Sequence, residues 1–556
     1  MNKKVCSFPI LFALLALLIG TCAVVFPASA QAVPTSTGSI TVSGTVARSY
    51  DAYQIFSANV VDGDSDAKIA TDLAWASDAV RDAVLPVLHS AGMPNSQTTA
   101  QEAAEWLNTD SHLTSALSAQ LARSLQGSGA EPVALNAGTA AELPCGYWLI
   151  VAKDDAIAQG EVGTAPIMAL VGGSAVTVKP KAATPKVSKH VLEDSTAAWQ
   201  KAADATVADD LYWRLSATVP AGLTAYDTYA VRFVDTMSAG LDPSKVAASM
   251  RVYVAAGADG GFDAVSTGKD GRAGTDPAKG WTDITAQCAT KVAADGKTFT
   301  VRIGDLIAAL GGADAFAAGA RVVAVYNAPL NSACNHGIAK GNPNEVYLRY
   351  PRSPFADQSG DAGFTHTPSD DACAYTWDLA LTKRGSDGDK PLAGAVLSIA
   401  DDRGRTLAAD GTWDAEGKAT VTTGEDGRVT VSGVDSGKLE VCELKAPKGY
   451  TAFEGTRCVT VKAEGLDVDQ VATAKPKLTI TAESPLRADS ADGSTGSLEA
   501  SLINTPTGTP PSITTGGFMP STGDMAMYAA AAAAVAGAAL IVVALLVKRG
   551  GGSHKE

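Results

Sequence analysis

The sequence predicts a mostly β protein of tandem β-sandwich domains, with helical insertions in the N-terminal domain and a transmembrane helix near the C-terminus. Alternating apolar and polar residues indicate half-buried strands at 211–217 and 346–350, and further strand-like stretches occur at 39–46 and 146–151. The 54 glycines and 26 prolines supply the turns that many short strands require. The apolar run 525–547 is long enough to cross a bilayer as a helix.

Composition excludes several functions before any motif is considered. The chain carries 44 basic and 59 acidic residues, a net charge of −15, which disfavours nucleic-acid binding because that depends on neutralising phosphates. The six histidines are scattered, and no nucleophile–histidine arrangement or metal-ligand spacing occurs. The sequence therefore predicts neither an enzyme nor a bound metal or cofactor. Asp-Gly pairs such as 426–427 are typical of turns, and none completes a calcium loop.

Both ends of the chain indicate export. Residues 1–30 have a basic start, an apolar centre and the small-x-small end Ala28-Ser29-Ala30, which predicts a cleaved signal peptide. The apolar run 525–547 is followed by the basic tail 548–556, which is expected to stay cytoplasmic. The mature chain should therefore lie outside the cell and be held in the membrane, at least transiently, by this helix.

Shifts in composition divide the chain between its two ends. The expected helical middle of the first part spans about 71–125, where apolar residues recur at helical spacing. A Lys/Pro/Thr stretch, 180–185, separates the first part from the second. The predicted parts are an N-terminal domain 33–181, a middle domain 182–376, a C-terminal domain 377–506 and a Thr/Pro/Gly spacer 507–524.

The spacer ends in a pentapeptide that resembles the sorting signal of sortase substrates. That signal is Leu-Pro-x-Thr-Gly followed by an apolar span and a basic tail, and here it reads Met519, Pro520, Ser521, Thr522 and Gly523. Methionine replaces the usual leucine and is of similar size and polarity. The resemblance implies that a sortase cysteine attacks the Thr522 carbonyl, releases Gly523 and transfers the acyl group to an amine.

The third part resembles a Cna-B-type immunoglobulin-like domain of Gram-positive pilins. The resemblance lies in Leu-Ala-Leu-Thr-Lys at 379–383, Pro-Leu-Ala-Gly-Ala at 391–395, the segment 441–450 and Leu-Ile-Asn-Thr-Pro at 502–506. The middle part is similar to the middle domain of such pilins through 233–241. Nearly the whole mature chain thus resembles SpaA-type backbone pilins, the type 2 fimbrial major subunits, and this implies tandem Cna-type β-sandwiches.

The resemblance implies an intramolecular isopeptide bond in the third part. In that family a lysine of the first strand joins an asparagine of the last strand, and a buried carboxylic acid assists; the matching residues are Lys383, Asn504 and Glu443. Burial lowers the pKa of a lysine and raises that of a carboxylic acid, so a neutral amine and a neutral acid can meet in the core. One ammonia leaves, once per molecule.

The same comparison gives Lys189 and Asp235 as the lysine and the acid of the middle part. The expected acceptor position holds Arg352, which cannot form an amide. Either Asn342 or Asn344 substitutes, or this bond is absent. The opening strand of the first part has no lysine, so no bond is predicted there.

The polymerising amine of this family lies at the end of the N-terminal domain in a Val-x-Val-Tyr-Pro-Lys pattern. Here the string 176–181 reads Val-Thr-Val-Lys-Pro-Lys, which aligns Lys181 with the pilin lysine. Lys179 replaces the tyrosine and is a competing acceptor.

Six cysteines remain after signal-peptide removal, in a secreted context that permits disulfides. Cys442 and Cys458 are expected to pair because they flank a turn region, and Cys334 is the candidate partner of Cys373. Cys145 and Cys288 are left over, in different predicted domains.

The sequence therefore predicts a structural shaft subunit of a covalent pilus, secreted and anchored to the cell wall as a surface fimbria. Its implied partners are a sortase, identical subunits, accessory pilins and peptidoglycan, and a host surface ligand is left open. The alternative is a wall-anchored adhesin or accessory pilin that binds host matrix without polymerising. A usable acceptor at Lys181 distinguishes the two.

Overall fold

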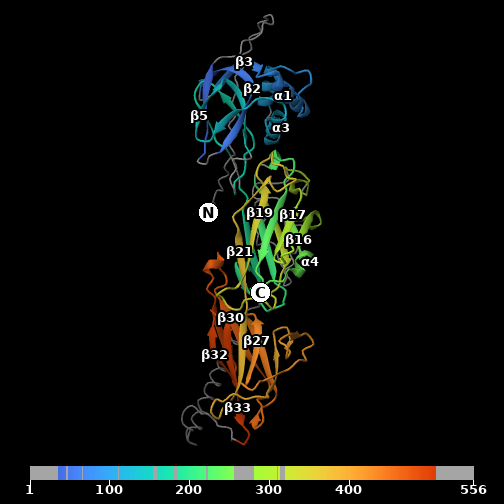
Figure 1. Ribbon diagram of the computed structural model, residues 1–556, viewed down its shortest axis with the longest axis vertical. Helices are drawn as coiled ribbons and strands as arrows, with labels where there is room; N and C mark the ends of the chain where they lie inside the picture. The colour runs from blue at the N-terminus through green and yellow to red at the C-terminus, as the bar shows by residue number, and fades with distance from the viewer. Residues whose placement is uncertain are drawn as a thin grey trace, which may run out of the picture.

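The computed structural model describes residues 36–44, 48–64, 67–109, 112–153, 160–180, 184–220, 223–255, 281–309, 311–313 and 320–508. Within these residues the strands fall into three groups that share no sheet: β1–β8, β9–β21 and β22–β33. We call them the first, middle and third modules. They are stacked end to end along the long axis of the molecule (Figure 1). The prediction of a mostly β chain of tandem sandwiches is confirmed.

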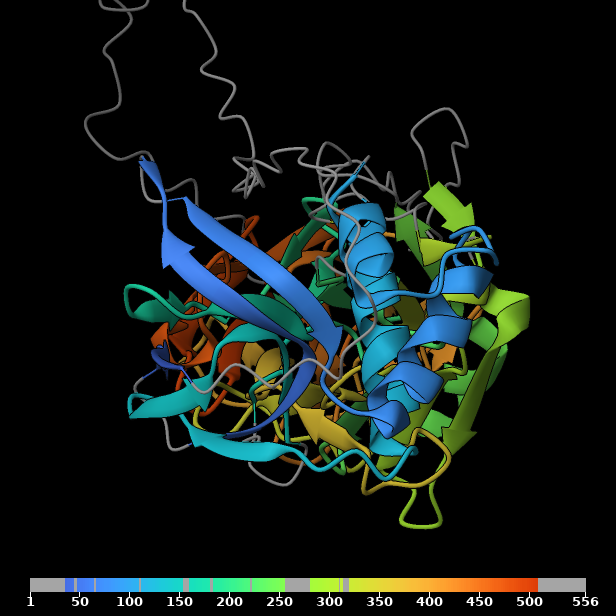
Figure 2. The same cartoon turned by 90° about the horizontal axis from the view of Figure 1, so that it is seen from above.

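The first module combines two sheets with a group of helices. One sheet has the order β5-β1-β8, and the other has the order β3-β2-β6-β7 with β4 paired to β2. The helices lie together on one side of the strands (Figure 2). Its elements are β1 (Thr37–Val42), β2 (Ser49–Asp62), β3 (Lys68–Trp75), α1 (Asp78–Ser90), α2 (Ala100–Asn108), α3 (Ser115–Gln126), β4 (Val133–Asn136), β5 (Ala140–Pro144), β6 (Gly146–Ala152), β7 (Ile167–Val171) and β8 (Val176–Val178).

The helical stretch of the first module begins later than the sequence predicted. Residues expected at its start form β3, which pairs with β2, because tertiary pairing overrides local helix propensity there. Side-chain caps then define where the helices begin. The Ser77 hydroxyl accepts a hydrogen bond from the Val80 amide at α1, and Thr99 forms a capping box with Glu102 at α2.

The middle module is a sandwich of two larger sheets, ordered β10-β9-β12-β18-β14-β15 and β11-β21-β19-β13-β17-β16. Its elements are β9 (Val187–Glu193), β10 (Ala198–Gln200), β11 (Ala202–Asp204), β12 (Tyr212–Thr218), β13 (Val231–Met237), α4 (Val246–Ser249), β14 (Arg251–Ala255), β15 (Trp281–Asp283), β16 (Cys288–Val292), β17 (Thr298–Ile303), α5 (Leu306–Ala309), β18 (Arg321–Asn327), β19 (Asn342–Pro351), β20 (Phe364–His366) and β21 (Asp370–Tyr375).

The third module is a second sandwich, with sheets ordered β27-β22-β33-β29 and β25-β24-β23-β28-β30-β31. Its first and last long strands, β22 and β33, run parallel and side by side. Its elements are β22 (Trp377–Gly385), β23 (Val396–Ala400), β24 (Thr406–Leu407), β25 (Trp413–Asp414), β26 (Val421–Thr422), β27 (Arg428–Val434), β28 (Gly437–Lys445), β29 (Tyr450–Thr451), β30 (Thr456–Glu464), β31 (Lys477–Ala482), β32 (Leu486–Asp492) and β33 (Ser497–Pro506).

The cores follow from the two-residue period of these strands. On β22 the side chains of Leu379 and Leu381 are buried, and on β33 those of Leu498 and Leu502 are buried. Polar residues that fall on the same inward-facing positions are therefore carried into the core. Lys383 and Asn504 occupy such positions, and this places them in the candidate site.

Candidate functional site

In the third module three polar side chains meet inside the apolar core. Lys383 continues the inward face of β22, Asn504 continues that of β33, and Glu443 comes from β28 on the opposite sheet. The parallel register pairs Lys383 with Leu502 and Gly385 with Asn504, so the lysine and the asparagine are diagonal neighbours on one face. The strand order thus brings together residues 121 positions apart in the chain.

The distances among these groups suit amide formation. The Asn504 Nδ2 donates to both carboxylate oxygens of Glu443, at 2.9 and 3.0 Å. The Lys383 Nζ lies 3.2 Å from Glu443 Oε1 and also donates to Asn504 Oδ1. All three residues are buried, so water is kept from the amine and the carboxamide. The lysine nitrogen is therefore held beside the side-chain carbonyl group that it would attack.

Burial also prepares the nucleophile. It lowers the pKa of Lys383 to about 8, although the adjacent Glu443 acts in the opposite direction. A substantial fraction of this amine is consequently neutral near physiological pH, and only the neutral amine has a free electron pair. The Phe453 amide donates to Glu443 Oε2 at 3.1 Å and thereby holds the carboxyl group beside the amine.

A second buried cluster lies in the middle module. Lys189 on β9 donates from Nζ to Asp235 on β13, and both side chains are fully buried. Asn344 reaches this cluster from β19. Asn342 does not, because its amide is satisfied by backbone groups of Asn335 and Ala374. Of the two asparagines that the sequence left open, Asn344 contacts the buried cluster and Asn342 does not.

The middle cluster contains one residue that the sequence did not indicate. The Tyr326 hydroxyl, on β18, accepts from Lys189 Nζ at 2.9 Å and from Asn344 Nδ2 at 2.8 Å, and donates to Asp235 Oδ2 at 3.0 Å. The only signal in the sequence was a tyrosine at the end of a run of aliphatic residues, 322–325, in this strand. Which residues it meets depends on packing between two sheets, and this cannot be deduced from the alternation of one strand.

Burial shifts the ionisation of this cluster in the direction that amide formation needs. It lowers the pKa of Lys189 to about 8, against the opposing effect of Asp235. It also raises the pKa of Asp235 above its ordinary value, although Lys189 and Tyr326 both act in the opposite direction. The two side chains can therefore exchange one proton and become a neutral amine and a neutral carboxylic acid.

Several predicted sites fall outside the described residues. They are the signal peptide, Lys181, the sorting pentapeptide 519–523 and the apolar run 525–547. Of the string 176–181, β8 holds the first three residues and Lys179 is exposed just after it. None of the helices in the described ranges has the length and apolar character needed to cross a membrane.

The predicted disulfides are not present in the structure, where all six cysteines that lie within the described ranges are free. The register pairs Cys442 with Thr456 and Cys458 with Glu440, so these two cysteines are diagonal rather than opposite. Diagonal neighbours lie about 7–8 Å apart and their Cβ atoms somewhat less, which still exceeds the roughly 4 Å between Cβ atoms that a disulfide requires. Cys334 instead lies beside His336, with Sγ 3.5 Å from Nε2, and Cys373 is buried within β21.

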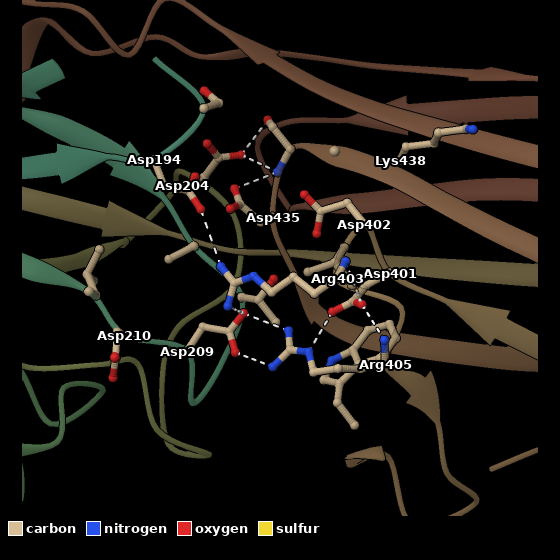
Figure 3. Close-up of a pocket in the computed structure, with 18 of the residues that line it drawn as sticks. Asp194, Asp204, Asp209, Asp210, Asp401, Asp402, Arg403, Arg405, Asp435 and Lys438 are labelled. Carbon is tan, nitrogen blue, oxygen red and sulfur yellow. Dashed lines mark hydrogen bonds and ion pairs between the residues drawn. The ribbon is translucent and has the colours of Figure 1, made fainter. Parts of the chain in front are cut away.

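A cleft of about 640 Å³ separates the middle and third modules, and acidic residues line much of it (Figure 3). Asp204 crosses this junction, since its Oδ2 accepts from Trp377 Nε1 at 2.6 Å and from the Ser436 amide at 2.9 Å. Arg405 binds Asp209 through two hydrogen bonds of 2.5 and 2.8 Å. These contacts tie the third module to the middle one.

Comparison with known proteins identifies the third module. Residues 378–476 match the family model described as SpaA, prealbumin-like fold domain. The third module is a SpaA prealbumin-like domain. The resemblance stated from the sequence is therefore confirmed over these residues, which include Lys383 and Glu443 of the buried cluster.

The chain is also similar to a surface protein of Streptococcus pyogenes serotype M6, the trypsin-resistant surface T6 protein, at 30% identity over 143 residues. The match covers 24% of this chain and 24% of that relative's length. Among solved structures, the T6 backbone pilin of the same organism matches with a TM-score of 0.46 and 16% identity, over 85% of this chain and 98% of the pilin. The major pilin SpaD of Corynebacterium diphtheriae matches with a TM-score of 0.41 and 15% identity, over the same shares of the two chains.

Proposed function

We propose that this chain is the shaft subunit of a covalent pilus on a Gram-positive cell surface. The observation that carries the proposal is the buried Lys383–Glu443–Asn504 cluster, in a module that matches the SpaA domain. A covalent link between the first and last strands suits a subunit that transmits tension along its length, because those strands would otherwise be free to separate. The sorting signal at 519–523 and the similarity to a surface protein support the same location.

The bond in the third module would form by proton transfer followed by attack. Neutral Lys383 Nζ attacks Cγ of Asn504, and the new C–N bond forms as the carbonyl electrons move to oxygen. Glu443 passes a proton to Nδ2 and accepts one from Nζ, so ammonia leaves and the amide remains. The product is one isopeptide bond and one ammonia per module. The same chemistry in the middle module would join Lys189 to Asn344.

Polymerisation would use the two ends of the mature chain. A sortase cysteine breaks the Thr522–Gly523 bond, and the resulting acyl group passes to the Lys181 amine of another subunit. The shaft would thus be a series of identical chains joined by amides, and its base would be transferred to peptidoglycan. Accessory pilins would enter through the same sorting signal or the same amine.

Lys181→Arg is expected to abolish the high-mass ladder in cell-wall extracts, because an arginine guanidinium stays protonated and cannot attack the acyl-enzyme. Electrophoresis of wall extracts measures this directly. Lys179→Arg is the matched control and should leave the ladder intact. A ladder that survives Lys181→Arg and disappears with Lys179→Arg would show that Lys179 is the acceptor lysine. A wild-type chain found only as an anchored monomer would support the adhesin alternative.

A further inference from the structure

We infer that Tyr326 is a catalytic residue of the middle-module bond, where its hydroxyl carries a proton from Asp235 to the departing amide nitrogen of Asn344. This inference rests on the proposed bond between Lys189 and Asn344. In the third-module cluster Glu443 contacts the asparagine nitrogen directly, without a hydroxyl group between them.

The two clusters differ in how the acid reaches the leaving nitrogen. In the third module Glu443 contacts Asn504 Nδ2 directly, at 2.9 and 3.0 Å. In the middle module the acid is Asp235, which has one methylene fewer. Its Oδ2 contacts Lys189 and Tyr326, and its Oδ1 has no hydrogen-bond partner among the described residues.

The Tyr326 hydroxyl fills the gap left by the shorter acid. It accepts from Asn344 Nδ2 at 2.8 Å and donates to Asp235 Oδ2 at 3.0 Å. It also accepts from Lys189 Nζ at 2.9 Å, so the single donor and both acceptor sites of the hydroxyl are used. One oxygen atom thereby touches the nucleophile, the acid and the leaving group.

Other buried tyrosines of the same module show what a purely structural role looks like. Among the described residues, the hydroxyls of Tyr229 and Tyr350 are buried and have no hydrogen-bond partner. Their rings fill the core and their hydroxyls serve no polar group. The Tyr326 ring is equally buried and is held edge-on by Phe299, with ring centroids 4.8 Å apart, which fixes the direction of its hydroxyl.

The step balances without an external reagent. Lys189 first gives a proton to Asp235, which leaves a neutral amine and a carboxylic acid. Nζ attacks Cγ of Asn344 and the Nζ–Cγ bond forms. As the Cγ–Nδ2 bond breaks, Tyr326 gives its hydroxyl proton to Nδ2 and takes the proton of Asp235. Nζ then returns a proton to Asp235, and the products are ammonia, an amide and a neutral acid.

The test is the intact mass of freshly expressed ectodomain carrying Tyr326→Phe. The wild type is expected to lose two ammonia masses, one for each module. The variant should lose only one, because the third-module bond does not depend on Tyr326 and still forms. Loss of a general acid–base group slows such a step by about 100-fold or more, so the second loss should lag in a time course after induction. Tyr350→Phe is the matched control, since it removes a buried hydroxyl without a partner, and it should lose both.

The outcomes separate this inference from the proposal on which it rests. If the wild type loses only the third-module ammonia, the proposed bond of the middle module does not form. A wild type and a Tyr326→Phe variant that lose both ammonia masses at the same rate overturn the relay alone. If circular dichroism shows that Tyr326→Phe does not fold, the double variant Tyr326→Phe, Asp235→Glu tests the relay instead. Its longer acid should reach Asn344 Nδ2 directly, as Glu443 reaches Asn504 Nδ2 in the third module. Recovery of the second ammonia loss in that double variant supports the relay, and a folded double variant that stays unbonded overturns it.

Discussion

Glu443→Gln is expected to leave the third module without its covalent bond, so the ectodomain should retain one ammonia mass that the wild type loses. Glutamine keeps the shape of the side chain and can still hydrogen-bond to Asn504, but it cannot exchange a proton with Lys383. Electrospray mass spectrometry of the intact ectodomain measures the difference. Glutamine has nearly the same volume as glutamate, so the module is expected to fold although the carboxylate beside Lys383 Nζ is lost.

The same variant should be much less stable. The proposed bond would close a loop of 121 residues (504 − 383), and a cross-link over about 100 residues stabilises by roughly 4–5 kcal/mol in the chain-entropy treatment. For a module of this size, that corresponds to a fall in melting temperature of about 15–20 °C. Calorimetry should show this fall in melting temperature in the transition that belongs to the third module. Glu440→Gln, on the exposed face of the same strand β28, is the control and should change neither mass nor melting temperature.

An unchanged ammonia loss in Glu443→Gln would show that the carboxyl group of Glu443 is dispensable. The Phe453 amide that donates to Glu443 Oε2 would then be the remaining candidate for orienting the cluster. A bond that forms while the melting temperature still falls by the full amount would separate the covalent contribution from the polar one. In either case the assignment of Glu443 as the acid would be wrong.

The third-module cluster could be predicted from sequence because each of its residues sits on a strand whose alternation is plain. Lys383 follows Leu379 and Leu381 at two-residue spacing, and Asn504 follows Ala500 and Leu502 in the same way. A polar residue at an inward position is costly unless it is paired, so a lysine and an asparagine at such positions imply a partner. The resemblance to a family then supplied the identity of that partner, Glu443.

The middle cluster was predicted less completely, for a physical reason. Lys189 and Asp235 also lie on inward positions, but the choice between Asn342 and Asn344 depends on what each amide meets across the sandwich. Asn342 and Asn344 are two residues apart on β19 and both point inward, so the alternation of the strand cannot distinguish them. Tyr326 was missed for the same reason. Contacts between sheets are long-range properties of packing, and the pattern of a single strand does not contain them.

The contacts between modules were likewise beyond the sequence. Asp204 and Ser436 are 232 residues apart and meet only because the middle and third modules are stacked. Beside them lies Glu193, whose Oε1 accepts from the Ser195 hydroxyl at 2.5 Å and whose Oε2 accepts from the Asp204 amide at 3.2 Å. Asp194 and Asp435 complete the group of carboxyls at this junction (Figure 3). So many acidic groups in one partly buried place must influence stability.

Raising the pH from about 5 to 8 is accordingly expected to destabilise this junction. Burial, reinforced by the charge of Asp204, raises the pKa of Glu193 from 4.5 to about 7. Burial also raises the pKa of Asp435, with Asp204, Asp194 and Glu193 acting in the same direction. The ion pair between Arg403 and Asp194, at 3.5 Å, offsets part of this repulsion. The folded state therefore holds protons here that the unfolded chain has already released.

The direction of the effect follows from that difference in proton binding. Glu193 binds its proton more tightly in the folded state, so its contribution to stability is complete below pH 4.5 and is lost as the pH rises through 7. A shift of this size corresponds to about 3 kcal/mol, a large part of the stability of a typical domain. Urea unfolding at several pH values should show the free energy of unfolding falling across this range.

Glu193→Gln should abolish most of that slope, because glutamine carries no charge at any pH and, like the protonated acid, keeps one carbonyl oxygen as an acceptor. The variant should therefore match the wild type near pH 5 and exceed it in stability at pH 8. Glu345→Gln, an exposed glutamate on β19 of the same module, is the control and should leave the slope as it is. A wild type whose stability is flat between pH 5 and 8, or a Glu193→Gln variant that keeps the slope, would mean that the carboxyls at the junction are ionised throughout. The stacking of the two modules would then depend on Arg405 and its two hydrogen bonds to Asp209 rather than on retained protons.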